Sequence, residues 1–134
     1  MKPDPNKLRM AAMLGFLAVA LGAIGAHGFK SSWEASLPAV EAAHRVEVWK
    51  TASLYHIVHS VVLLVLAYVF PERDRGTGIV NCFTGGILVF SGTLYALCLT
   101  GMKWLGAITP IGGLLMMLGW LLLVLSASPR KQSK

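Results

Sequence analysis

Three histidines stand in or beside apolar sequence, where imidazole chemistry could take place. His56 and His59 are three residues apart, so on a helix both rings would lie on one face. His27 lies at the end of an earlier apolar stretch. Imidazole nitrogens bind borderline metal ions, ligate haem iron or relay protons near neutral pH. The pattern therefore raises three interpretations: a metal site, a haem site and a proton path.

Each of these chemistries normally needs a partner that the apolar stretches do not supply. Metal sites usually add a carboxylate or a thiolate, and proton paths in membranes usually include Asp or Glu. No Asp or Glu lies within an apolar stretch, and Cys82 and Cys98 are sixteen residues apart on one of them. We therefore predict no catalytic residue and no cofactor, with a histidine-based metal or haem site as an alternative.

Neutral polar residues recur at similar depth once the apolar stretches are drawn as antiparallel spans. The predicted cluster consists of His27, His56, His59, Ser91, Tyr95 and Thr109. Two interpretations of this cluster are open. In the first, the side chains hydrogen-bond one another or exposed backbone and fix the register of the helices. In the second, a transporter or channel has a polar path past His27, His59 and Thr109.

The elements that would position these residues are four membrane-spanning helices. The chain of 134 residues is 55% hydrophobic and 13% charged, with a mean hydropathy of +0.64, whereas soluble domains are about 25% charged. Its charges lie outside four apolar stretches, at about residues 10–27, 52–70, 79–99 and 104–125. Each stretch is long enough to cross a bilayer. We predict an all-α fold: one transmembrane domain over residues 1–134, a compact four-helix bundle with a short amphipathic helix at about 38–50.

The distribution of basic residues predicts the orientation. Eight of the 12 Lys and Arg residues lie on the side of the two termini and four on the other side. Basic loops stay in the cytoplasm, so both termini should be cytoplasmic and the protein should lie in the inner membrane. The net charge of +6 is then explained by topology and by contact with lipid headgroups, which argues against a nucleic-acid partner.

Small residues and prolines predict how the helices pack. Close helix contacts in lipid rely on small residues, and those that we assign to packing are Gly15, Gly22, Gly25, Gly85, Gly92 and Gly106. A helix kink is predicted at Pro110, Gly112 and Gly113, because proline removes a backbone hydrogen bond. Trp33, Trp49 and Trp104 are predicted to anchor the protein at the membrane interface.

Several segments together resemble the family called domain of unknown function 423, whose eukaryotic relatives are similar to transmembrane protein 256. The segments are residues 22–28 (Gly-Ala-Ile-Gly-Ala-His-Gly), 49–60, 90–95, 106–113 and 119–120. The resemblance implies a four-span inner-membrane protein and brings no reaction or substrate. It leads us to expect Gln as readily as His at position 56, which leaves His27 and His59 as the stronger pair.

The functional prediction is a non-enzymatic accessory or assembly subunit. Glycine-rich helix faces without catalytic charges favour a protein that packs against other helices. Its expected partners are the lipid bilayer and either further copies of itself or a larger membrane complex. The alternatives are the transporter or channel and the histidine-based metal or haem site.

Overall fold

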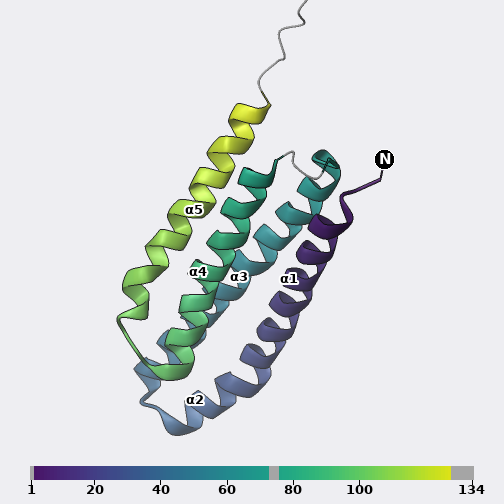
Figure 1. Cartoon of the computed structure of the whole chain (residues 1–134). Helices are drawn as coiled ribbons and strands as arrows, with labels where there is room; N and C mark the ends of the chain where they lie inside the picture. The colour runs from purple at the N-terminus through teal and green to yellow at the C-terminus, as the bar shows by residue number, and fades with distance from the viewer. Residues whose placement is uncertain (1, 73–75, 128–134) are drawn as a thin grey trace, which may run out of the picture.

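The computed structural model describes residues 2–72 and 76–127, and every regular element within them is a helix (Figure 1). The elements are α1 (Pro5–Ile24), the π-helical turn η1 (Gly25–Phe29), α2 (Lys30–Ser36), α3 (Ala39–Val69), α4 (Thr77–Thr100) and α5 (Leu105–Ser126). α1, η1 and α2 follow one another without a gap, so the first span extends into a helix that ends at Ser36. The predicted all-α class is confirmed.

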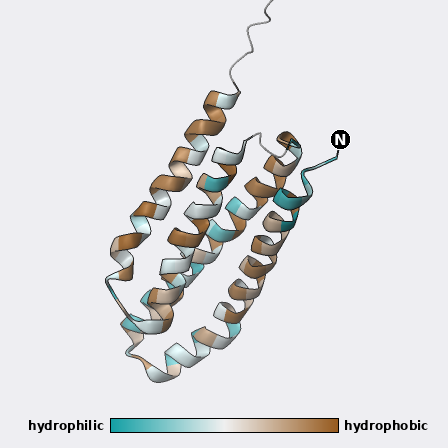
Figure 2. Ribbon diagram, in the orientation of Figure 1, coloured by the Kyte–Doolittle hydropathy of each residue, from teal (hydrophilic) through white to brown (hydrophobic). Residues whose placement is uncertain are grey.

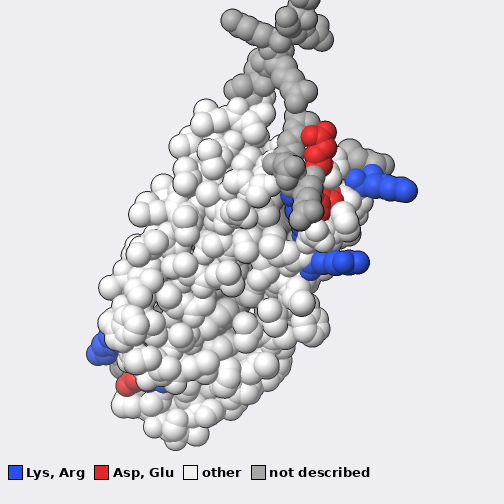
Figure 3. Space-filling view, in the orientation of Figure 1, with Lys and Arg blue, Asp and Glu red and all other residues white. Residues whose placement is uncertain are grey.

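The helices pack in the order in which they occur in the chain. α1 packs on α3, α3 on α4 and α4 on α5, so α1 and α5 form two sides of the bundle. The start of α1 and the end of α5 lie at the same end of the molecule (Figure 1). Each of the four long helices is long and apolar enough to cross a membrane. Apolar residues predominate along their length (Figure 2), and the charges visible in Figure 3 gather near the two ends of the bundle.

Local sequence fixes where α1 begins and where α4 ends. The carboxylate of Asp4 accepts hydrogen bonds from the backbone N–H groups of Asn6 and Lys7, at 2.8 and 3.1 Å, and Pro5 fills the first helical position. The bond from the Lys7 N–H is the main reason why the pKa of Asp4 lies below its ordinary value. After α4, Gly101 adopts the left-handed conformation, with φ of 74°, that closes helices.

α3 is longer than a membrane span. Its 31 residues extend over about 46 Å, against about 30 Å for a hydrocarbon core. Residues 39–50, expected as an amphipathic helix, form its first turns. The predicted outer helix and the second span are therefore one continuous element.

The buried side chains form two clusters along the bundle axis. One surrounds Phe83 and Leu63 in the half nearer the termini, and the other surrounds Trp49, Tyr95 and Cys98 in the opposite half. Phe83 and Cys98 have no exposed surface. The half nearer the termini is therefore mainly aliphatic around Phe83, and the opposite half is richer in aromatic rings.

Glycine contacts decide where helices approach most closely, and they differ from the predicted set. Of that set, only Gly25 sits where a Cβ would overlap a neighbour, the indole of Trp49. A Cβ at Gly22 or Gly92 would meet no atom within 4 Å. Gly15, Gly85 and Gly106 leave room for ordinary contacts, at 3.4 to 3.9 Å. The other glycines within helices at close approaches are Gly86, Gly112 and Gly119.

The region predicted to kink forms part of the α4–α5 contact. α5 continues through Pro110 without a break, and Pro110 itself is exposed. A Cβ at Gly112 would lie 2.8 Å from Cα of Phe90, whereas one at Gly113 would lie 3.8 Å from the Phe90 ring. Gly112 therefore lets the backbones of α4 and α5 touch, and the structure shows no broken helix end at this point.

Candidate functional site

The first group of buried polar side chains joins α3 to α4. Ser91, with 1% of its surface exposed, donates a hydrogen bond of 2.8 Å to the carbonyl of Ala52. One turn further along α4, the hydroxyl of Tyr95 lies 3.4 Å from Nδ1 of His56 and donates to Oγ of Ser53 at 3.3 Å. These groups hold the two helices in register.

His56 carries one polar atom for which the described residues offer no partner. Its ring is buried, and Nε2 forms no hydrogen bond. A buried polar atom without a partner is rare, and it often marks the place of a water molecule or ligand. His56 is therefore the strongest candidate for a functional group inside the bundle.

His59 is directed differently, although it lies only one turn away. Its Nδ1 donates a hydrogen bond of 2.8 Å to the carbonyl of Tyr55, because a carbonyl can only accept. Its ring lies 5.6 Å from that of Phe83 and 6.4 Å from that of Trp120, measured between centroids. The two histidines therefore contact different neighbours, His56 on α4 and His59 partly on α5.

Thr109 belongs to a third group, between α4 and α5. Its hydroxyl lies 2.8 Å from that of Thr93 and donates to the carbonyl of Leu105 at 3.2 Å. This pair joins the first turns of α5 to α4, and within the described residues it forms no hydrogen bond to either histidine.

His27 lies apart from the buried polar groups. It is exposed on η1, whereas His59 is 6% exposed and packed among rings. His27 and His59 therefore lie in different surroundings, and the path past His27, His59 and Thr109 stays a prediction. Within residues 2–72 and 76–127, no three His, Cys, Asp or Glu residues lie close enough to share a metal ion.

Two of the three predicted interfacial tryptophans are core residues. Trp33 and Trp49 are 7% and 3% exposed. Trp33 stacks on Phe29, and Trp49 contacts the rings of Trp33 and Tyr95 in the same aromatic cluster. The indole of Trp49 also donates a hydrogen bond of 2.9 Å to the carbonyl of Leu21, beside η1. Trp104 alone has the exposure, 59%, that an interfacial anchor requires.

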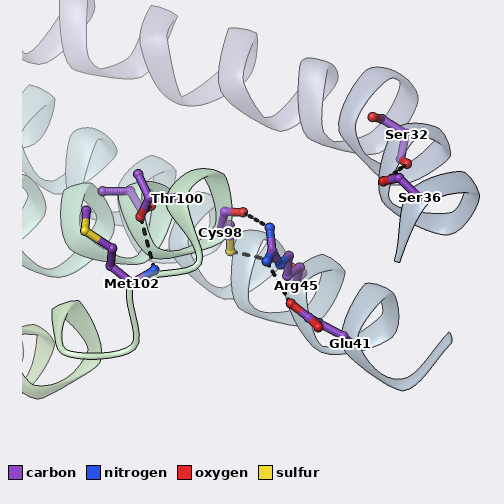
Figure 4. A network of polar contacts seen from close by, with 8 residues as sticks. Ser32, Ser36, Glu41, Arg45, Cys98, Thr100 and Met102 are labelled. Carbon is purple, nitrogen blue, oxygen red and sulfur yellow. Dashed lines mark hydrogen bonds and ion pairs between the residues drawn. The ribbon is translucent and has the colours of Figure 1, made fainter. Parts of the chain in front are cut away.

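Two basic side chains bind backbone carbonyls at helix ends, in addition to favouring one membrane orientation. Arg45 donates to the carbonyl of Cys98 at 2.9 Å, near the end of α4, and also pairs with Glu41 at 2.7 Å (Figure 4). Lys7, at the other end of the bundle, donates to the carbonyls of Phe70 and Glu72 just after α3. Cations stabilise helix C-termini, where unpaired carbonyls carry partial negative charge. Composition could not show which of the 12 basic residues take this role.

The α4–α5 loop and α2 carry further polar contacts at the same end as Arg45. The backbone N–H of Met102 donates to the hydroxyl of Thr100, and the hydroxyl of Ser36 donates to the carbonyl of Ser32 (Figure 4). Each contact is local to its own turn. They close helix ends.

Comparisons with known proteins agree with this architecture. The model of the family described as "Protein of unknown function (DUF423)" matches residues 21–113. The UPF0382 membrane protein YwdK of Bacillus subtilis is 37% identical over 124 residues, which cover 88% of this chain and 92% of that protein. A UPF0382 membrane protein of Staphylococcus aureus is 35% identical over 123 residues, covering 87% and 90%.

The relatives are named as membrane proteins, which fits the four apolar helices. No enzymatic name occurs among them, and no solved structure matches the chain. The family match covers most of the bundle, from the end of α1 into α5. The chain is therefore a small integral membrane protein that belongs to the DUF423 family.

Proposed function

We propose that this protein is a non-enzymatic membrane subunit that acts by assembling with other transmembrane helices, either in further copies of itself or in a larger complex. Support comes from the use of its buried polar side chains. Ser91, Trp49 and Arg45 all donate to backbone carbonyls of neighbouring helices. Side chains arranged in this way stabilise a scaffold.

One observation carries the proposal: α5 has a single close neighbour and presents an unpaired leucine stripe. Only 22% of its most apolar window is buried, the same share as in the first span and less than the 39% of α3 and the 33% of α4. The stripe consists of Leu114, Leu118, Leu121 and Leu125, with exposures of 63, 44, 55 and 60%. Its spacing of four, three and four residues is that of a coiled-coil seam, a packing geometry that transmembrane bundles also use. We therefore assign the assembly face to this stripe.

Cysteine cross-linking of the protein in native membranes tests this assignment. In a Cys82→Ala background, Leu121→Cys should give a cross-linked product larger than the monomer. Val19→Cys, which is 64% exposed on α1, is the matched control and should not. The particle in mild detergent should also be larger than one chain. A strict monomer with no co-purifying partner, or equal cross-linking at both positions, would contradict the proposal.

The proposed location is the inner membrane, with both termini in the cytoplasm. The start of α1 and the end of α5 share one end of the bundle. In the sequence, the two terminal segments and the connection between α3 and α4 hold eight of the 12 basic residues, against four in the other connections. Basic loops remain in the cytoplasm.

Passage of protons is the second candidate function, because of the unpaired Nε2 of His56. His56, Tyr95 and Ser53 form a polar row, and Ser53 lines a pocket at the bundle end opposite the termini. Liposomes with the protein should dissipate an imposed pH gradient faster than empty ones, and His56→Leu should abolish this excess. His44→Leu, at an exposed site on α3, is the control. Equal rates in protein-containing and empty liposomes would exclude this function.

A further inference from the structure

Two pockets follow one another along the same side of the α1–α3 pair. The one nearer η1 is lined by Gly22, Ala26, Lys30, Trp49, Lys50 and Ser53, among others. The second is lined by Gly15, Ile57, Val61 and Leu64, among others. On α3, residues 50, 53, 57, 61 and 64 are three or four apart, so they form one stripe. We call these two pockets together the α1–α3 groove.

Small residues of α1 keep the groove open. A Cβ at Gly22 would meet nothing within 4 Å, and one at Gly15 would lie 3.9 Å from Cβ of Ser60. No side chain therefore fills the space beside Gly22. From Lys50 to Val61 the groove is about 17 Å long, which suits an extended acyl chain.

Two lysines line the end of the groove near η1. Lys30 and Lys50 are the charged residues that line it. Each contacts a carboxylate, Glu34 at 3.9 Å and Glu47 at 2.7 Å, but both pairs are exposed. Exposed ion pairs are weak, so a phosphate group can compete for the ammonium groups. Ser53 accepts a hydrogen bond from Tyr95, which leaves its own hydroxyl hydrogen for an oxygen in the pocket.

We propose that the α1–α3 groove binds one anionic glycerophospholipid. The ammonium groups of Lys30 and Lys50 hold the phosphate, and an acyl chain runs along the groove past Gly22 and Gly15 towards Leu64. The two lysines match the anionic headgroup of such a lipid, and the apolar part of the groove matches an acyl chain. The site goes beyond the proposed assembly role, because it lies away from the α5 stripe and involves different residues.

Native mass spectrometry of the full chain, released from detergent with added phosphatidylglycerol or phosphatidylcholine, tests the proposal. Wild type should retain one phosphatidylglycerol on the order of tenfold more than phosphatidylcholine, since each lysine near an anionic headgroup favours binding severalfold. Gly22→Leu, which fills the groove, should reduce the retention of phosphatidylglycerol to that of phosphatidylcholine. Lys30→Gln combined with Lys50→Gln should do the same.

Matched controls separate the site from general effects. Gly92→Leu adds the same side chain at another open glycine, and Lys2→Gln with Lys103→Gln removes the same charge elsewhere. Both controls should keep the wild-type preference. Equal retention of the two lipids by wild type, or unchanged retention after the Lys30 and Lys50 substitutions, would overturn the proposal even if Gly22→Leu failed to fold. Competition by soluble glycerol phosphate at lipid concentrations would overturn the lipid assignment in favour of a phosphate site.

Discussion

Replacing Gly112 with alanine should force α4 and α5 apart, whereas the same change at Gly113 should be nearly neutral. A Cβ at position 112 would overlap the backbone nitrogen of Phe90 and lie 2.8 Å from its Cα. Backbone atoms cannot rotate away as a side chain can, so the helices must move. We expect Gly112→Ala to lower the free energy of unfolding by about 3 kcal/mol, at the upper end of overpacking costs.

Gly113→Ala is the matched control, because it adds the same methyl group one residue later. Its Cβ would lie 3.8 Å from the Phe90 ring, an ordinary contact, and alanine gains about 0.5–1 kcal/mol over glycine within a helix. The measurement is reversible unfolding of both variants in mixed micelles of mild and denaturing detergent, followed by circular dichroism. Equal stabilities of the two variants would show that the α4–α5 contact is looser than the structure indicates.

Gly25→Ala should expel the indole of Trp49 from its position against η1. A Cβ at position 25 would overlap the indole nitrogen and lie 2.9 Å from Cε2 of the ring. The hydrogen bond from Trp49 to the carbonyl of Leu21 would be lost with the packing. We expect a loss of about 2–4 kcal/mol in the free energy of unfolding, from overpacking and the lost hydrogen bond together.

A double-mutant cycle tests whether Trp49 is the cause. In a Trp49→Ala background the indole is absent, so Gly25→Ala should cost little. Gly22→Ala, three residues earlier, should be tolerated in either background because its Cβ would meet no atom within 4 Å. A large cost of Gly25→Ala in the Trp49→Ala background would mean that Gly25 is required by the π-helical turn itself.

The sequence was informative about helices and poor about the contacts between them. Helix positions follow from apolar runs without charges, and cap residues such as Asp4 and Gly101 refine their ends. Which glycine contacts a neighbouring helix depends on the rotation of each helix about its own axis. The spacing of small residues alone does not fix that rotation. The spacing thus selected Gly22 and Gly92, where a Cβ would meet no atom within 4 Å, and it did not distinguish Gly112 from its neighbour Gly113.

The candidate site illustrates the same difference. Sequence placed His56 and His59 on one helix, and both are buried there. Their ring directions depend on rotamers and on the neighbours that α4 and α5 supply, so His56 contacts Tyr95 while His59 packs against Phe83 and Trp120. Depth along the membrane normal is a one-dimensional coordinate, and residues at equal depth can lie on different sides of a bundle.

Helix content and the number of spans follow from the sequence alone, because four uncharged apolar runs of about 20 residues can cross a bilayer as helices that satisfy their own backbone. Tertiary structure alone decided which polar groups meet, which glycines touch a neighbour and which surfaces remain open. It placed Trp49 inside the bundle, left α5 with one close neighbour and kept a groove beside Gly22. These features depend on distances between helices, which are set by side chains far apart in the sequence.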